Sequence, residues 1–277
     1  MPPITNAMPE LERRLEFFPA PEEGPARLTP QQIRQYNEQG FVFPLDVFGP
    51  EVALAHRRYF DHLMENAQEA GWNSYSINGW HQHCAGIHDL VTEPRILDFV
   101  QDLLGEDLVC WGTHYFCKMP GDGKRVSWHQ DASYWPLTPS QTVTVWLAID
   151  DADLENGAMQ VIPGSHRHGQ IAFEPSAPEE GNVLNQTVHK ADQYGAAPVA
   201  FVMRAGQISL HSDLLLHGSE PNLSARRRFG LTMRFVPPSV RALRGWNARS
   251  VICRGRDPEG HWAHLPRPAG DQLPLKG

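Results

Sequence analysis

The run LVCWGTHYFCK, residues 108–118, opens a half of the chain that consists of short β-rich segments. Valine, threonine and aromatic residues fill it, as is typical of strands. The tripeptide Glu155-Asn156-Gly157 predicts a tight hairpin further along. Sequential short strands favour a mainly β fold with flanking helices, a double-stranded β-helix or jelly roll of the cupin type. The other four runs are TVTVWLAID (142–150), AMQVIPG (158–164), QISLHSDLLLH (207–217) and RFGLTMRFV (228–236).

Helices are expected before that β-rich half. In LTPQQIRQYNEQG, Thr29 can cap a helix that begins with proline, and Gly40 can end it in the left-handed conformation. A second helix is expected over residues 51–70. A third is expected over TEPRILDFVQDLLG, residues 92–105, where Thr92 would be the cap. Apolar residues recur at helical spacing in this third helix, so it should bury one stripe.

The chain is expected to form one domain with a ragged N-terminal end. Residues 1–27 are rich in proline and lack apolar periodicity, so we expect an extended or flexible arm. Residues 28–277 should form a single domain, because all-β barrels of about 200–250 residues commonly do so. The polar residues 171–198 are expected to form a lid loop within that domain.

Composition argues against several classes of partner. The 277 residues carry a formal net charge of −8, so neither nucleic acid nor an anionic membrane is an expected partner. The four cysteines show neither CxxC spacing nor the density of a disulfide scaffold. No signal-peptide pattern and no run of 18 apolar residues occurs. We therefore expect a cytoplasmic protein that acts on a small molecule, of a subunit number that composition does not indicate.

The segment SWHQDASYW, residues 127–135, carries the first candidate for chemistry. His129 and Asp131 lie two residues apart, so on an extended strand both side chains would leave the same face and reach one ion. The 2-His-1-carboxylate site of non-haem iron enzymes needs one more imidazole, and His217 in LLLHGSEPN is the best candidate. A structural His–Asp hydrogen bond has the same pattern, so the surrounding residues must decide.

The run HSDLLLH contains a second His-x-Asp pair, His211 and Asp213. Its strand parity matches that of His217, so all three side chains could face inward together. Three ligands on consecutive inward positions of one strand would be nearly collinear, which does not suit a triangle around one ion. We therefore interpret His211 and Asp213 as structural groups or as groups that orient a ligand.

Three arginines follow His217. Arg228, eleven residues later, begins a predicted strand, where its guanidinium could bind a carboxylate through two parallel hydrogen bonds. The co-substrate 2-oxoglutarate has such a carboxylate at its far end. The alternative is that Arg226, Arg227 and Arg228 form a solvated turn, and we accept it for the first two.

The chain resembles the phytanoyl-CoA dioxygenase family of Fe(II)- and 2-oxoglutarate-dependent oxygenases. The resemblance runs from LTPQQIRQYNEQGFV to about Phe235 and rests on that segment, WHQDASYWPL, NGAMQVIPGSH, and HGSEPN followed by an arginine. It implies that His129, Asp131 and His217 are the catalytic metal ligands, that the metal is Fe(II), and that O2 is the oxidant.

The resemblance also implies a co-substrate site for 2-oxoglutarate. The family arginine that binds its distal carboxylate carries onto Arg228, and a small hydroxyl residue carries onto Ser219. Trp146 matches a family tryptophan beside the co-substrate. His114 falls where the family has a variable side chain near 2-oxoglutarate, so it completes the predicted set.

The activity implied is hydroxylation of a small, polar metabolite with release of succinate and CO2. Desaturation and cyclisation by the same family stay open as alternatives. A halogenase would replace the carboxylate ligand by a small residue, whereas this chain keeps Asp131. A cupin-like metalloenzyme that does not use 2-oxoglutarate is opposed by Arg228 and Ser219. A non-catalytic jelly-roll binding protein is the remaining alternative, since fold alone does not fix function.

The stretch NGWHQHCAGIH, residues 78–88, is expected to contribute substrate residues, because the family often supplies loop residues that face the substrate there. Trp80, His81 and His83 lie in this stretch, and Trp135 could add an aromatic wall. Ordinary loop and core positions are equally compatible with these residues. A small polar or zwitterionic metabolite is expected rather than a long acyl-CoA, whose phosphates would require a basic mouth.

Overall fold

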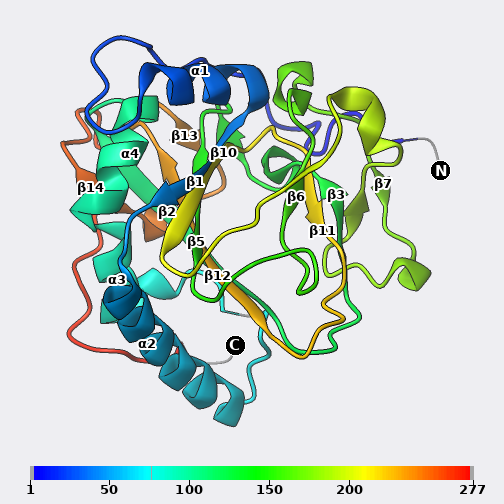
Figure 1. The fold of residues 1–277 in the computed structure, drawn as a ribbon. Helices are drawn as coiled ribbons and strands as arrows, with labels where there is room; N and C mark the ends of the chain where they lie inside the picture. The colour runs from blue at the N-terminus through cyan, green and yellow to red at the C-terminus, as the bar shows by residue number, and fades with distance from the viewer. Residues whose placement is uncertain (1–2, 76, 275–277) are drawn as a thin grey trace.

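The computed structural model of this chain describes residues 3–75 and 77–274. The first two residues of the predicted arm and the last three of the predicted domain lie outside the described residues. Two antiparallel sheets form the centre of the molecule, and helices flank the larger one (Figure 1). Within the described ranges, no helix is both long and apolar enough to cross a membrane.

The larger sheet has six strands in the order β1-β10-β5-β12-β2-β14. Every neighbouring pair is antiparallel. The sheet therefore joins residues from both ends of the chain, with the predicted strands β5, β12 and β2 near its centre. The bounds are Phe41–Asp46 (β1), Leu108–Lys118 (β2), Val143–Ala148 (β5), Gln207–Ser212 (β10), Arg228–Val236 (β12) and Val251–Arg254 (β14).

The smaller sheet has four short strands in the order β3-β11-β6-β9. They are Val126–His129 (β3), Gln160–Val161 (β6), Val199–Ala200 (β9) and His217–Ser219 (β11). Two further strand pairs lie at the periphery: β4 (Leu137–Thr138) with β13 (Arg241–Ala242), and β7 (Glu174–Pro175) with β8 (Gln186–Thr187). A mainly β jelly roll with flanking helices is the predicted fold class.

Among the described residues, four α-helices complete the architecture, and α2, α3 and α4 lie beside the larger sheet, away from the smaller one (Figure 1). Apolar side chains from these helices and from the larger sheet form one continuous core. The α-helices are Pro30–Gln39 (α1), Pro50–Glu69 (α2), Ala85–Val91 (α3) and Pro94–Leu104 (α4). The 3-10 turns are Trp80–Gln82 (η1), Asp131–Ser133 (η2), Ser165–His168 (η3), Pro178–Glu180 (η4), Ala191–Tyr194 (η5) and Trp246–Arg249 (η6).

The first two predicted helices are present, and the third begins differently. Thr29 caps α1 by accepting a hydrogen bond from the Gln32 amide, and Gly40 ends the helix at φ 87°. Thr92, however, is not the N-cap of α4. Glu93 caps that helix through the Arg95 amide, and Thr92 ends the unpredicted helix α3, where its hydroxyl donates to the His88 carbonyl. Two helices meet where the sequence indicated the start of one.

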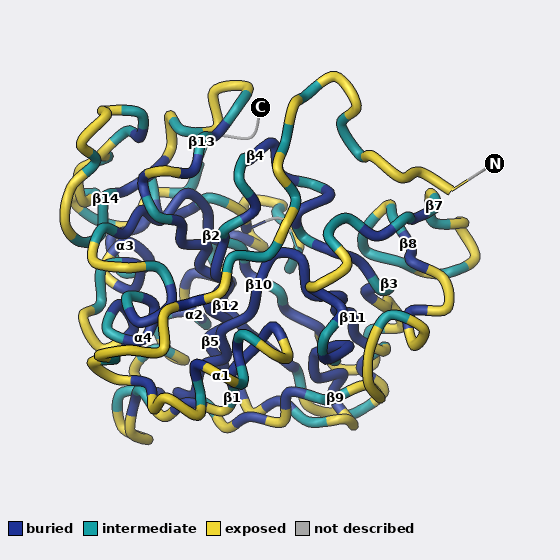
Figure 2. Tube along the Cα trace, turned by 90° about the horizontal axis from the view of Figure 1, so that it is seen from above, coloured by how far each residue is buried: buried dark blue, intermediate teal, exposed yellow. Residues whose placement is uncertain are grey.

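Strand β12 divides the interior into an apolar side and a polar side. Phe229, Leu231, Met233 and Phe235 face the core beneath the helices. Of the alternate positions, Arg228, Thr232 and Arg234 line a cavity on the other face, and Gly230 lies against Trp146. Figure 2 shows the central strands as an almost unbroken buried region, so these polar side chains lie deep inside the protein.

The run HSDLLLH does not form one strand. The prediction that His211, Asp213 and His217 face inward from a single strand is therefore wrong. Strand β10 ends at Ser212, the chain turns, and β11 begins at His217 in the other sheet. The Leu215 amide donates to the Ser212 carbonyl within this turn. His211 and His217 therefore approach the interior from different sheets, and the collinear arrangement does not arise.

Candidate metal and co-substrate site

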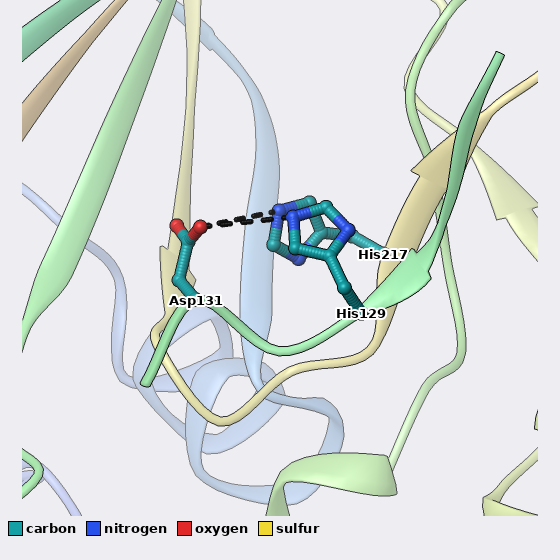
Figure 3. A group of neighbouring side chains, drawn as sticks. All are labelled: His129, Asp131 and His217. Carbon is teal, nitrogen blue, oxygen red and sulfur yellow. Dashed lines mark ion pairs between the residues drawn. The ribbon is translucent and has the colours of Figure 1, made fainter. Parts of the chain in front are cut away.

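Strands β3 and β11 bring the two predicted histidine ligands together (Figure 3). They are antiparallel neighbours in the smaller sheet, and His217 pairs directly with His129 across them. The two ring centroids are 4.1 Å apart, and both side chains are buried. Strand register, which the backbone hydrogen bonds set, thus fixes the spacing of the two imidazoles.

Asp131 reaches the same point from the turn η2. Its Oδ1 lies 3.7 Å from His129 Nε2 and 3.9 Å from His217 Nε2. One candidate ligand atom from each of the three residues lies within 4.8 Å of the others. The expectation that His129 and Asp131 share a strand is wrong, because β3 ends at His129 and a 3-10 turn then carries the carboxylate inward.

Hydrogen bonds orient both imidazole rings. Nδ1 of His129 lies 2.9 Å from the Ser127 carbonyl oxygen, and Nδ1 of His217 lies 2.9 Å from the Leu215 carbonyl oxygen. A carbonyl can only accept, so each Nδ1 carries the hydrogen and each Nε2 keeps its lone pair for a metal. Burial and the neighbouring His129 lower the pKa of His217 to about 3, which keeps its ring neutral.

The carboxylate of Asp131 stays ionised. Burial alone would raise its pKa, but His129, His217 and Arg234 together hold that pKa well below its usual range. Two neutral imidazoles and one ionised carboxylate are the donor set that non-haem Fe(II) sites use. The residues present therefore fit the metal that the sequence predicts.

The N-terminal arm supports the turn that carries Asp131. Nη1 of Arg13 donates to the carbonyl oxygens of Ala132 at 2.8 Å and Trp135 at 2.9 Å. From the other side, the Ala132 amide donates to the Asp213 carbonyl oxygen at 3.0 Å. The position of the candidate carboxylate ligand thus depends on two segments that are distant in sequence.

The second His-x-Asp pair makes other contacts. The His211 ring centroid lies 5.2 Å from that of His217, and its Nδ1 has no hydrogen-bond partner among the described residues. Asp213 accepts a hydrogen bond from Ser140 Oγ at 2.8 Å, and burial raises the pKa of its carboxyl group to about 7. Neither residue belongs to the group formed by His129, Asp131 and His217.

Arg228 is a buried cation without an acidic partner in the described part of the chain. It is 2% exposed, and its Nη2 donates a hydrogen bond to Ser219 Oγ at 3.5 Å. Its guanidinium carbon lies 5.6 Å from the Trp146 ring centroid. Burial lowers the pKa of Arg228 to about 10, which still leaves it protonated at neutral pH. The predicted partners Ser219 and Trp146 are thus beside it.

Gly230 leaves room for the Trp146 indole because it has no side chain. A Cβ atom at Gly230 would lie 2.1 Å from Trp146 Cζ2, so even alanine would displace the ring. His114, on the neighbouring strand β2, hydrogen bonds through Nε2 to the Tyr75 carbonyl oxygen at 2.8 Å. Both Trp146 and His114 line the cavity that contains Arg228.

Arg226 and Arg227 differ in burial and in their ion-pair partners, although both were expected to be solvated. The Arg226 side chain is half exposed and pairs with Asp153 and Glu155 at the surface. Arg227 is not solvated: its Nε lies 2.6 Å from Asp150 Oδ2, and its Nη2 lies 2.5 Å from Asp61 Oδ1. Because the Asp150 side chain is only 5% exposed, Arg227 has a structural role.

We expect Arg227→Ala to lower the free energy of unfolding by about 1–3 kcal/mol, because it leaves the buried Asp150 with fewer partners. The matched control Arg226→Ala removes an exposed ion pair and should change it by less than about 0.5 kcal/mol. Urea unfolding followed by tryptophan fluorescence measures both. Equal stability of the two variants would contradict the structural role of Arg227.

A cavity of about 650 Å³ lies between the sheets and contains both the candidate metal site and the candidate co-substrate site. All seven predicted metal and co-substrate residues line it, and so does Trp135. The segment over residues 171–198, predicted to be a lid, contains the strand pair β7 and β8 and contributes Leu184 to the cavity wall.

Three predicted substrate residues lie elsewhere. Trp80 is buried in the core beneath the larger sheet, and His83 is exposed. His81 hydrogen bonds to Thr113 Oγ1 and to the Arg249 carbonyl oxygen. The same stretch does reach the cavity, but through its small and amide residues Asn78, Gly79 and Gln82. The turn η1 directs the aromatic and imidazole side chains away from it.

The structure adds cavity residues that the sequence reading missed. Arg234 lies on β12 at the same parity as Arg228, which is the signal that could have identified it. Trp111 and Trp246 extend the aromatic wall begun by Trp135. Arg244 and Arg249 also line the cavity and are exposed, so basic residues stand at its mouth. The added residues are Arg234, Trp111, Trp246, Arg244 and Arg249.

Comparison with known families agrees with this geometry. The model of the phytanoyl-CoA dioxygenase (PhyH) family matches residues 36–230. The peroxisomal phytanoyl-CoA dioxygenase of Bos taurus is 33% identical over 151 residues, covering 52% of this chain and 44% of that protein. A probable alpha-ketoglutarate-dependent hypophosphite dioxygenase of Stutzerimonas stutzeri is 31% identical over 153 residues, covering 54% and 52%. The chain spans about half the length of these curated relatives.

Solved structures show the same fold. The apo form of the non-heme monooxygenase ThoJ superposes with a TM-score of 0.73 at 29% identity, covering 86% of this chain and 88% of that one. EctD from S. alaskensis, solved with 2-oxoglutarate and 5-hydroxyectoine, superposes with a TM-score of 0.70 at 19% identity over 93% and 94%. The predicted jelly roll is confirmed. Since the family model covers most of its length, the chain belongs to the phytanoyl-CoA dioxygenase family of Fe(II)- and 2-oxoglutarate-dependent oxygenases.

Proposed function

We propose that this protein is an Fe(II)- and 2-oxoglutarate-dependent dioxygenase that hydroxylates a small polar metabolite and releases succinate and CO2. One observation carries the proposal: a cluster of two imidazoles and a carboxylate shares a cavity with a buried, unpaired guanidinium. The first group suits a ferrous ion, and the second suits the distal carboxylate of 2-oxoglutarate.

The proposed ligands are His129, Asp131 and His217. Their Nε2 and carboxylate atoms converge, while the Nδ1 atoms are held by backbone carbonyls, so little reorganisation is needed on metal binding. When bound, iron supplies the activation of O2 that is coupled to oxidation of 2-oxoglutarate. The chain itself would supply the Asp131 carboxylate in a fixed position and two imidazole rings, His129 and His217, whose Nδ1 atoms are held by backbone carbonyls.

The proposed co-substrate residues are Arg228, Ser219, Trp146 and His114. Arg228 would bind the distal carboxylate, and Ser219 would accept from the guanidinium and hold it in place. Trp146 covers the guanidinium, which shields the pair from water and strengthens it. His114 borders the same cavity from β2.

Hydroxylation is proposed ahead of halogenation because Asp131 occupies the position that a halide would need. Desaturation or ring closure remains the alternative outcome within the same chemistry. Two further neighbours are described as a carbocyclase and an epimerase, at 22% and 18% identity, which is a likeness of fold alone. Amide, imidazole and guanidinium groups stand in the cavity wall beside its aromatic residues, which supports a substrate that carries polar groups.

The expected result is that purified protein, given Fe(II), 2-oxoglutarate and air, converts 2-oxoglutarate to succinate. The conversion should accelerate when a metabolite panel contains the substrate, and mass spectrometry of that metabolite should show a gain of one oxygen atom. Mn(II) in place of Fe(II) is the control, because it suits the same ligands but should not support turnover. Saturable binding of 2-oxoglutarate without succinate formation would favour a non-catalytic protein.

A further inference from the structure

A second buried guanidinium lies in the cavity, away from the one assigned to 2-oxoglutarate. Arg234 is 8% exposed and makes no hydrogen bond or ion pair with any described residue. Its Nε is enclosed and has no hydrogen-bond partner, and the residue lines the cavity. Arg234 interacts with the Asp131 carboxylate only through longer-range electrostatics. A buried charge without a direct ion pair is costly, so such a group is usually matched by a ligand or a counter-ion.

The position of Arg234 separates it from the co-substrate end. Arg228 and Arg234 share one face of β12 and are six residues apart, so their Cα atoms are roughly 20 Å apart. Gly112 pairs with Arg234 on β2 and has no side chain, which leaves space for the guanidinium. The two arginines therefore enter the cavity from opposite ends.

Aromatic side chains surround the Arg234 end. Its guanidinium carbon lies 4.8 Å from the Trp135 ring centroid and 5.6 Å from that of Trp111. Trp246 adjoins Trp111 at a centroid distance of 5.6 Å and is 39% exposed at the surface. These rings fix the guanidinium in place and offer an apolar wall to the body of a bound molecule.

The charges in the cavity show that Arg234 lacks a counter-ion. In the loaded site, the charges of iron and Arg228 are matched by those of 2-oxoglutarate and Asp131. Histidine binds a metal as a neutral imidazole, so Arg234 would remain as a positive charge in the cavity without a counter-ion among the described residues. Arg249, exposed at the mouth and without an ion pair among the described residues, adds to this positive field.

We propose that Arg234 anchors the primary substrate, and that this substrate carries an oxyanion, a carboxylate or a phosphonate, on a body that packs against Trp135 and Trp246. This inference rests on the proposed function and specifies its substrate class. The anion would be held at one end of the cavity while 2-oxoglutarate would occupy the other, so both could be bound at the same time. Arg234 is thus a specificity-determining residue.

Small probes test the anchor without knowledge of the substrate. Anaerobic protein is loaded with Fe(II) and saturating 2-oxoglutarate, and the methyl proton relaxation of acetate, methylphosphonate and neutral acetamide is measured. We expect the paramagnetic iron to enhance relaxation of acetate or methylphosphonate over acetamide, and the stronger of the two identifies the anion. In Arg234→Gln, binding should weaken by about tenfold or more. Arg234→Lys should restore part of it.

Controls separate this inference from the proposed function. Arg226→Gln removes an equal charge outside the cavity and should leave the anion effect intact. The metal-to-ligand charge-transfer absorption of the Fe(II)–2-oxoglutarate complex should form normally in Arg234→Gln. If the wild-type protein forms no such complex, the proposed function fails. If the complex forms but acetamide relaxes like the anions, or Arg234→Gln keeps the preference, the anchor is disproved and the oxygenase assignment stands.

Discussion

Replacing His129, Asp131 or His217 by alanine should abolish turnover and reduce Fe(II) affinity by more than the roughly 10–100-fold expected for residues that only orient a ligand. Each substitution removes one of three converging donor atoms, and two ligands hold a ferrous ion far less well than three. Equilibrium dialysis of Fe(II) under anaerobic conditions measures affinity, and succinate formation measures turnover.

The second His-x-Asp pair provides the matched control. His211→Ala and Asp213→Asn change the same residue types close by, but His211 lies beside the cluster and Asp213 bonds to Ser140. Both variants should keep iron, with losses no larger than about 10–100-fold. If His211→Ala lost iron while His129→Ala retained it, the ligand assignment would have to move to the second pair.

Arg228→Ala should raise the 2-oxoglutarate concentration needed for half-saturation by a factor of about 30 to several thousand. A charge-assisted pair in a closed pocket costs roughly 2–5 kcal/mol when one partner is truncated. Iron affinity should be unchanged, because Arg228 has no contact with the three candidate ligands. Titrating 2-oxoglutarate into anaerobic Fe(II) protein and following the charge-transfer absorption measures the shift.

Two companion variants define the geometry of that pair. Arg228→Lys keeps the charge but loses the two-pronged donor, so it should lie between the wild type and alanine. Arg226→Ala should titrate like the wild type, since that side chain pairs at the surface. An unchanged curve for Arg228→Ala would remove it from the co-substrate site and turn attention to Arg234 or Lys118.

The strands were predictable where alternation and composition agreed. The runs at 108–118 and 228–236 coincide with β2 and β12, because aromatic and β-branched residues fill both strands. The candidate pair His129 and Asp131 was predicted from its spacing, although the shared strand assumed for it was wrong, and His217 was predicted from the family resemblance. Their convergence in the structure follows from the register between β3 and β11, which joins residues that no local pattern connects.

The remaining features depended on tertiary contacts. Helix α3 was missed because it has only seven residues and no side-chain N-cap, so it gives almost no local signal. Arg227 was taken as solvated because the burial of Asp150 cannot be read from neighbouring letters. Arg234 was overlooked since one basic residue in an apolar strand becomes meaningful only when the cavity beside it is known.

The contact between Arg13 and the turn after β3 bears on how the protein is assembled. Arg13 leaves the ribosome well before Ala132 and Trp135, the residues whose carbonyls it binds. The arm must therefore wait during synthesis until the jelly roll has formed enough to receive it. Arg13→Gln, or a proteolytic cut between the arm and α1, would delay or loosen this late docking step. The final position of the Asp131 turn thus depends on a residue that is synthesised 119 positions before Ala132.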